Sequence, residues 1–146
     1  MPTYTIHTIS GRLTNADRAA LSEAVVGAHS EVTGAPAVFA QVIFSEIPHG
    51  HWYVGGGNAP NEQVFLYGRI RAGRTAEQKA KLLAALTEAV ASNLEVDPVR
   101  VWVYLLDVPA ENLLEYGRPL PPPGGEKEWV ESLPPDAFPK PPVHGQ

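Results

Sequence analysis

The order strand, helix, strand occurs twice along this chain, and this repetition restricts the fold more than any other feature. The first unit covers residues 3–47, a connection covers 48–62, and the second unit covers 63–108. Each unit has the length of a βαβ motif, whose crossover is right-handed and whose strands run parallel. The sequence therefore predicts an α/β (α+β) fold, in which two tandem βαβ units form a four-stranded sheet with both helices on one face.

The first unit begins with the alternating segment Thr3–Ile9, which is typical of a strand. A helix is expected from Thr14, a capping residue, to Gly34, which with Pro36 ends it. Its apolar positions recur at helical spacing at Leu21, Ala24, Val25, Ala28 and Val32. Residues Ala37–Ile47 are apolar on both faces, which predicts a strand in the centre of the sheet.

The second unit repeats this order after a glycine-rich connection, in which we expect a short hairpin arm. Val64–Arg71 reads as a strand, and Thr75 with Gln78 predicts the capping box of a helix. The apolar stripe of this helix is Leu82, Leu83, Leu86, Ala89, Val90 and Leu94. Asp97-Pro98 ends the helix before the last long strand, Val99–Leu106.

The end of the chain is rich in proline and differs from the rest. We expect a single domain over residues 1–117, with one or two helical turns in 109–117, and then an arm over 118–146 without regular structure. Trp129, Val130 and Leu133 give this arm apolar surface to bury on its own or a neighbouring subunit, while Pro139–Gln146 is expected to be loose.

Two helices on one face leave the other face of the sheet uncovered. Its residues, among them Val42 or Ile43 and Trp102 or Val103, are too apolar for water. A patch of that size ordinarily packs against another subunit, so we expect a homo-oligomer.

The composition narrows the possible functions. The 146-residue chain has a formal net charge of −5 without a basic block, which argues against nucleic acid as a partner. It has no cysteine, no apolar run of membrane-spanning length and no signal-peptide pattern, so we expect a cytoplasmic protein that binds no membrane. His49 and His51 have no third ligand in view, so neither a metal nor a cofactor is expected.

Pro2 becomes the amino terminus if Met1 is removed, and its secondary amine is then a group that no side chain supplies. A free amino terminus titrates near neutrality, and burial or nearby charge shifts its pKa, so it can serve as acid or base. The alternative is that Pro2 merely starts a strand, where a missing N–H costs nothing.

Arg69, Arg71 and Arg74 surround the end of the third strand and the start of the second helix, where the helix dipole also favours an anion. They indicate a corner that binds a carboxylate. The alternative is a solvated basic strand end paired with surface acids. Three further polar residues, taken singly, fit structural roles as a core histidine, a core aromatic and a turn carboxylate: His29, Tyr104 and Glu115.

Taken as a set, these residues resemble those of the tautomerase superfamily, whose members use an amino-terminal proline, and within it the cis-3-chloroacrylic acid dehalogenase family. The similarity runs from Pro2 to about Leu133 and includes AQVIF at Ala40–Phe44, VWVY and EYGRPLPPPG. The proline-rich last stretch departs from the family. The reactive residues of the family fall on Pro2, His29, Arg71, Arg74, Tyr104 and Glu115.

The resemblance implies a trimer that adds water to a small unsaturated acid, so that cis-3-chloroacrylate yields malonate semialdehyde and chloride. In that mechanism the two arginines bind the carboxylate, the glutamate helped by the tyrosine activates water, and the protonated proline delivers the proton. The histidine aids substrate placement.

Two other classes of function stay open. A keto-enol tautomerase for a phenylpyruvate-type acid would use neutral Pro2 as the base, with the same residues and a different proline pKa. A non-enzymatic ligand-binding or assembly module would also fit, because a βαβ duplication does not determine function.

Overall fold

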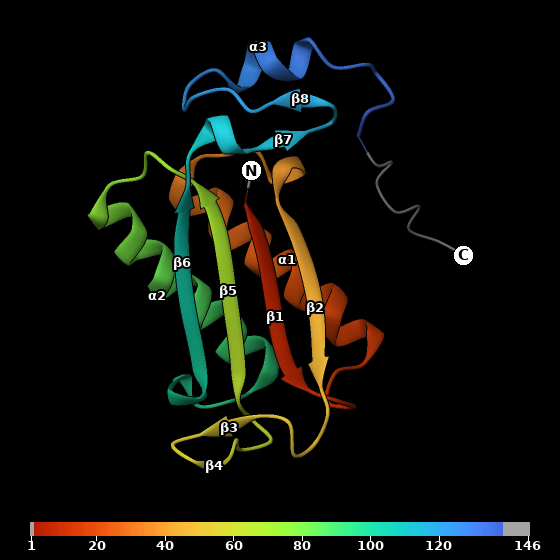
Figure 1. Ribbon diagram of the computed structural model, residues 1–146, viewed down its shortest axis with the longest axis vertical. Coiled ribbons are helices and arrows are strands. Elements are labelled where there is room, and N and C mark those ends of the chain that lie inside the picture. The colour runs from red at the N-terminus through yellow and green to blue at the C-terminus, as the bar shows by residue number, and fades with distance from the viewer. Residues whose placement is uncertain (1, 139–146) are drawn as a thin grey trace. The chain divides into compact units, whose positions relative to one another are not determined.

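Residues 2–138 are described by the computed structural model, and they form two compact units, one through Asp107 and one from Val108. The first unit holds a four-stranded sheet and two long helices (Figure 1). The second holds a short hairpin and a short helix. Each unit is described below by itself.

The sheet has the strand order β2-β1-β5-β6, so the two repeated halves meet at β1 and β5. β1 (Thr3–Ile9) pairs in parallel with β2 (Gln41–Ile47) and antiparallel with β5 (Val64–Arg71). β6 (Val101–Val108) runs in the same direction as β5 (Figure 1). The predicted α+β fold, with two βαβ units in one four-stranded sheet, is confirmed.

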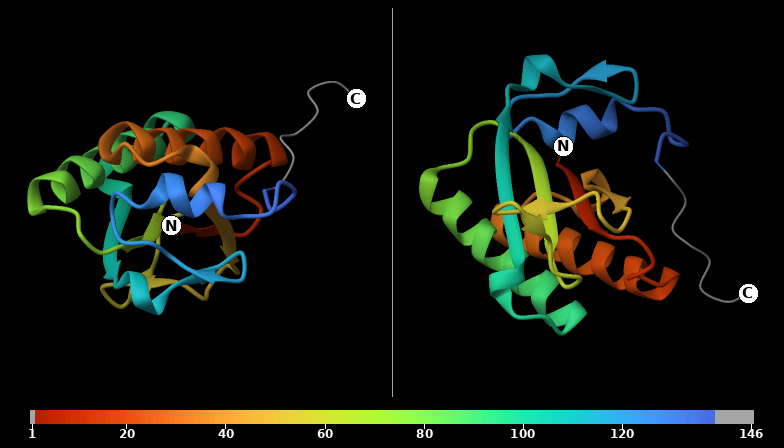
Figure 2. Two further views of the ribbon diagram at one scale, coloured as in Figure 1. Left: turned by 90° about the horizontal axis from the view of Figure 1, so that it is seen from above. Right: turned by 60° about the horizontal axis from the view of Figure 1, so that its bottom comes forward.

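The helices α1 (Asn15–Thr33) and α2 (Ala76–Leu94) pack against each other on one face of the sheet, as predicted (Figure 2). Each begins with a capping box, at Thr14 and at Thr75, which satisfies N–H groups that the first helical turn leaves without intrahelical partners. α1 ends at Gly34, whose φ of 73° suits glycine better than a residue with a side chain.

The core of this unit lies between the sheet and the helices. The strands contribute alternate residues because successive strand side chains point to opposite faces, and the helices contribute one stripe each. Fully burying one Val or Leu side chain stabilises a fold by about 1.5–3 kcal/mol, so this layer dominates the stability of the unit. Its buried members include Ile6, Leu21, Val25, Leu66, Ile70, Leu82, Leu86 and Val90.

Two expectations for the second strand are wrong. The strand begins at Gln41 rather than Ala37, because Ala37–Phe39 forms a 3-10 turn after Pro36 and buries Phe39. β2 also lies at the edge of the sheet rather than at its centre. An edge strand presents backbone groups that another chain can pair with, and this one is apolar on both faces.

The sheet face opposite the helices is apolar and exposed. Strand alternation turns Val42 and Val103 toward the core and leaves their neighbours outside. The exposed large side chains on this open face are Ile43 (46%), Trp102 (41%), Tyr104 (54%) and Leu106 (48%). Apolar patches of this kind usually mark an interface with another chain.

The connection between the two halves contains the expected hairpin, formed by β3 (Tyr53–Val54) and β4 (Gly57–Asn58). Gly55 and Gly56 at its turn have φ values of 60° and 84°, in the left-handed region where only glycine is unstrained.

The second unit is a small cluster around Trp129. After a 3-10 turn (Ala110–Asn112), β7 (Leu114–Glu115) pairs antiparallel with β8 (Arg118–Pro119), and α3 (Glu126–Glu131) follows. The indole Nε1–H of Trp129 donates to the carbonyl of Pro119 over 2.8 Å, and the ring is buried. Of the one or two helical turns expected in 109–117, one is present as the 3-10 turn, and the rest of the segment holds β7.

The expectation that the arm lacks regular structure is wrong for the described residues. Its prolines stand where they cost little, since Pro119 ends a short strand and Pro121, Pro122 and Pro123 precede α3. The expectation for Pro139–Gln146 concerns residues outside the described range. Among residues 2–138, no helix is long and apolar enough to cross a membrane.

Glu95 ends α2 in a conformation that favours glycine, with φ 53° and ψ 45°. Its carboxylate also lies at the negative end of the helix dipole. We predict that Glu95→Gly raises the free energy of unfolding by about 1 kcal/mol, because it removes both penalties. Glu95→Gln, which removes only the charge, should gain less. Urea denaturation measures both variants, and an equal gain in the two would contradict the backbone argument.

Candidate active site

Pro2 lies at the start of β1, where the ladder geometry determines its neighbours. It is buried, and its carbonyl accepts the backbone N–H of Gln41 over 3.0 Å, which extends the β1–β2 pairing. In the antiparallel β1–β5 ladder Thr3 faces Arg69, so one step further Pro2 faces Ile70. The amino-terminal end of β1 and the arginine-bearing end of β5 therefore lie side by side at one end of the strands (Figure 1). This end of the strands is called the Pro2 edge of the sheet below.

The predicted arginines occupy different environments at this edge. Arg69 is exposed, with its guanidinium 4.8 Å from the centroid of the Tyr67 ring. Arg71, at the end of β5, is only 7% exposed. Arg74 is half-buried and immediately precedes the Thr75 cap of α2. Burial of a guanidinium costs free energy unless its N–H donors form hydrogen bonds. The alternative of a solvated surface charge therefore fits Arg71 least well of the three arginines.

His29 reaches the same region from α1 through a contact with β1. Its Nδ1 lies 2.6 Å from the hydroxyl oxygen of Tyr4, and the two rings meet edge to face with centroids 5.7 Å apart. Tyr4 is fully buried and His29 is 3% exposed. His29 is thus a buried polar residue in a short, well-aligned hydrogen bond.

Burial controls the protonation of this pair. Desolvation, with smaller contributions from the positive charges of Arg74 and of the amino terminus, lowers the pKa of His29 to about 4. Desolvation also raises the pKa of the Tyr4 hydroxyl, against an opposing effect of Arg74. At neutral pH both groups are therefore uncharged. The charge of Arg74 acts on both of them, which links the arginine corner to the Tyr4–His29 pair.

Tyr104 lies elsewhere in the first unit. It projects from the open sheet face, where its ring meets Phe65 edge to face at 4.9 Å. Phe65 faces His7 on this open face, whereas Pro2 has the strand parity of the buried Tyr4 and so lies toward the helix face. Within one chain the structure therefore separates Tyr104 from Pro2. The alternative that Tyr104 is a core aromatic is wrong as well, because it is 54% exposed.

Glu115 belongs to the second unit, where it is the last residue of β7 and faces Arg118 across the hairpin. Tyr116 follows with φ 54°, and its ring contacts Trp129 at 6.0 Å and Phe138 at 5.2 Å between centroids. These ring contacts hold the hairpin in place, and the hairpin carries the half-buried Glu115.

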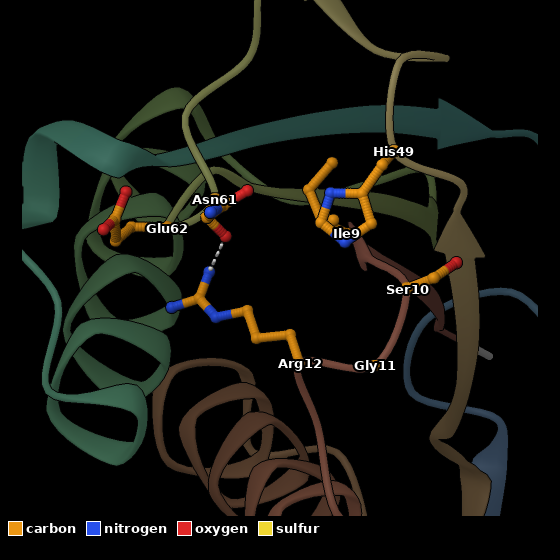
Figure 3. Close-up of a pocket in the computed structure, with 7 residues that line it drawn as sticks. All are labelled: Ile9, Ser10, Gly11, Arg12, His49, Asn61 and Glu62. Carbon is orange, nitrogen blue, oxygen red and sulfur yellow. Dashed lines mark hydrogen bonds between the residues drawn. The ribbon is translucent and has the colours of Figure 1, made fainter.

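A surface hollow of about 330 Å³ lies at the other end of β1 (Figure 3). There Arg12 donates to the carbonyl oxygen of Asn61 over 3.1 Å, and His49 lines the wall. None of the predicted reactive residues lines this hollow. Among residues 2–138, no three His, Asp or Glu side chains gather as metal ligands would.

Two residues at this edge were not identified from the sequence: Tyr4 and Gly68. Tyr4 was assigned only to one face of the first strand. The available signal was that a buried tyrosine hydroxyl requires a partner. Gly68 faces Tyr4 across the β1–β5 ladder, and a Cβ there would lie 2.6 Å from a ring carbon of Tyr4.

The low pKa of His29 predicts a loss of stability in acid. The folded pKa of about 4 lies below the ordinary 6.5, so between these values the unfolded chain binds a proton that the folded chain does not. The stabilisation from the neutral ring is complete above about pH 6.5 and declines as the pH falls toward about 4. His29→Asn, which can still accept from Tyr4 but does not titrate, should lose less stability than the wild type over this range.

Urea denaturation at a series of pH values measures this difference. His51→Asn, a change at an exposed histidine, is the matched control and should follow the wild type. Parallel stability curves for wild type and His29→Asn would contradict the prediction.

Comparison with known proteins identifies the family and the fold. The family model described as "Putative oxalocrotonate tautomerase enzyme" matches residues 1–132. The structure of N1, a member of the cis-3-chloroacrylic acid dehalogenase family, is 39% identical, with a TM-score of 0.87 over 90% of this chain and 92% of that one. No curated protein matches the chain.

Two further solved structures are similar. Pt0534 inactivated by 2-oxo-3-pentynoate is 28% identical, with a TM-score of 0.74 over 81% of this chain and 94% of that one. The F6 fused 4-OT asymmetric trimer is 26% identical, with a TM-score of 0.75 over 80% and 94%. With a family match over most of its length and this agreement in fold, the chain belongs to the tautomerase superfamily and, within it, to the cis-3-chloroacrylic acid dehalogenase family.

Proposed function

We propose that this protein adds water to a small unsaturated acid, with cis-3-chloroacrylate as the representative substrate, and that the amine of Pro2 is the general acid. The observation that carries the proposal is the β1–β5 register, which sets the chain start beside the buried Arg71 at one sheet edge. The 39% identity to a member of the cis-3-chloroacrylic acid dehalogenase family supports it.

Arg71 and Arg74 bind the substrate carboxylate in this proposal. A guanidinium presents a planar fork of donors that matches a carboxylate, and it stays charged at any working pH. Two such charges also withdraw electron density from the conjugated double bond, which makes the far carbon electrophilic.

The chemical step then needs a base and an acid on opposite sides of the double bond. Glu115, helped by Tyr104, removes a proton from water as its oxygen bonds to the far carbon, and Pro2 gives its proton to the near carbon. The product is a chloro-alcohol, which loses chloride and a proton to leave malonate semialdehyde. Glu115 returns its proton to solvent.

In this proposal Tyr104 acts from the open sheet face. In one chain it lies on the open face of the sheet, whereas Pro2 has the same strand parity as the buried Tyr4 and lies toward the helix face, and Tyr104 is exposed beside other apolar residues. We propose a homotrimer that buries these faces and brings Tyr104 to the site of a neighbouring subunit. The similar F6 fused 4-OT is a trimer, which supports this arrangement.

A keto-enol tautomerase is the second candidate. It is favoured by the match to a tautomerase family model and by the similarity to Pt0534. In that reaction neutral Pro2 moves a proton between carbon and oxygen, and no water needs to be activated. The two candidates therefore differ in the protonation state of Pro2 and in the need for Glu115.

The arginine corner gives the first test. Cis- and trans-3-chloroacrylate, an acetylenic analogue and enol-phenylpyruvate are compared as substrates, with intact mass showing that the sample begins at Pro2. Arg71→Ala and Arg74→Ala should each lower kcat/KM by about 10²-fold, because each removes a charge-assisted contact to the carboxylate. Arg69→Ala, from the exposed position on the same strand, is the matched control and should stay near wild type.

Melting curves check that the Arg71 variant remains folded. If folded Arg71→Ala and Arg74→Ala both keep the wild-type kcat/KM, the two arginines do not bind the substrate carboxylate and are only surface charges. A sample that retains Met1 and still reacts at full rate would exclude the amine as the acid.

Glu115 separates hydration from tautomerisation. Glu115→Gln keeps the shape but removes the base, so haloacrylate turnover should fall about 10²-fold or more while any tautomerase activity largely survives. Glu111→Gln, in the 3-10 turn of the same unit, is the control. Hydration should also decline as the pH rises through the proline pKa, and tautomerisation should do the reverse. Unchanged haloacrylate turnover in Glu115→Gln would favour the tautomerase.

A further inference from the structure

We propose that Tyr4 is a positioning residue that holds His29 as a neutral imidazole with its proton on Nε2, so that the site offers the substrate carboxylate an uncharged N–H donor. This inference rests on the function proposed above, since it assigns His29 its role toward the substrate. It also adds a residue outside the set that sequence reasoning identified.

The geometry makes Tyr4 the partner that orients the ring. The Tyr4 hydroxyl oxygen is 2.6 Å from Nδ1 of His29, a short distance for a bond between an O–H and a ring nitrogen. Both side chains are shielded from solvent, at 0% and 3% exposure, so water does not compete for either group. The edge-to-face contact of the rings, at an interplanar angle of 66°, further restricts rotation of the imidazole.

The direction of the hydrogen bond between Tyr4 and His29 determines the protonation state of each ring. A buried tyrosine keeps its proton and must place it on an acceptor, and Nδ1 is the ring atom at hydrogen-bond distance. Nδ1 therefore carries the lone pair. In a neutral imidazole the other nitrogen then carries the proton, so Nε2 is a donor. A carboxylate only accepts hydrogen bonds, so an Nε2–H donor suits a carboxylate substrate.

Gly68 makes room for this arrangement. It faces Tyr4 across the β1–β5 ladder, and a Cβ built on it would lie 2.6 and 2.9 Å from two ring carbons of Tyr4 and 2.9 Å from Cδ2 of Leu105. No ordinary Cβ contact is that short, so any larger residue at 68 must displace the Tyr4 ring. The glycine is therefore needed for the ring to lie against β5 and reach His29.

A neutral donor has a specific advantage at this edge of the sheet. Arg71, Arg74 and a protonated Pro2 already place three positive charges near the substrate carboxylate. A charged His29 would repel the protonated amine and lower its pKa, which would work against its role as the acid. An uncharged N–H adds a contact to the carboxylate without that cost.

The test compares Tyr4→Phe, which removes only the hydroxyl, with Gly68→Ala, which keeps the hydroxyl but displaces the ring. Tyr53→Phe, a hydroxyl deletion in the exposed β3–β4 hairpin, is the matched control. Nitrogen-15 NMR of the His29 ring identifies the tautomer, and the Kd of propanoate, a saturated acid that cannot be hydrated, measures carboxylate binding. Haloacrylate kinetics give the KM and kcat of each variant.

In the wild type the ring should show a bare Nδ1 and a protonated Nε2 near neutral pH. Tyr4→Phe and Gly68→Ala should both give averaged ring signals. They should raise the Kd of propanoate and the KM of haloacrylate by about threefold to tenfold, the effect of one hydrogen bond, with a smaller change in kcat. The double variant should lose little beyond the worse single one, because both act on one contact.

A proton on Nδ1 in the wild type would overturn the proposal. So would a Tyr4→Phe protein whose ring signals, propanoate affinity and KM all match the wild type. The ring spectra and propanoate binding do not depend on turnover. If the wild type hydrates no unsaturated acid but these two measurements behave as expected, the proposed reaction fails while the role of Tyr4 stands.

Discussion

The antiparallel pairing of β1 with β5 is the contact on which the rest of the structure depends. It joins the two repeated halves, and it places the start of the chain next to the end of the strand that carries Arg71. The same ladder sets Tyr4 opposite Gly68, whose missing side chain leaves room for the tyrosine ring. A slip of one residue would move every side chain of β1 to the other face of the sheet. The core and the candidate site therefore both depend on the register of the β1–β5 pairing.

Desolvation links this core to the chemistry. The layer that buries apolar side chains also buries Tyr4 and His29, and the cost of charging either group there keeps both neutral. The positive charge of the nearby Arg74 further raises the cost of a cationic histidine. The site that we propose for an anion would thus combine fixed charges with an uncharged donor supplied from the core.

The fold was more predictable from the sequence than the site. The period of apolar residues identified the strands, both helices and the Thr75 cap, because these depend on neighbours close in sequence. Strand order depends on contacts that periodicity does not encode, so β2 was wrongly placed at the centre. The Tyr4–His29 bond joins residues 25 positions apart, and only the register shows that Gly68 serves it. The hairpin at β7 was missed because prolines at strand and helix ends look like breaks in the sequence.

The position of Tyr104 on the open sheet face bears on the proposed assembly. A strand edge that is apolar on both sides and an open face with Trp102 and Leu106 41–48% exposed carry a free-energy penalty in water that only association removes. Tyr104 lies on the opposite face of its own sheet from Pro2, because Pro2 has the strand parity of the buried Tyr4. A face buried between subunits can meet the Pro2 edge of a neighbour. If Tyr104 does act in hydration, then assembly and catalysis are coupled: a change that opens the interface would remove the tyrosine from the site while leaving Pro2, Arg71 and His29 in place.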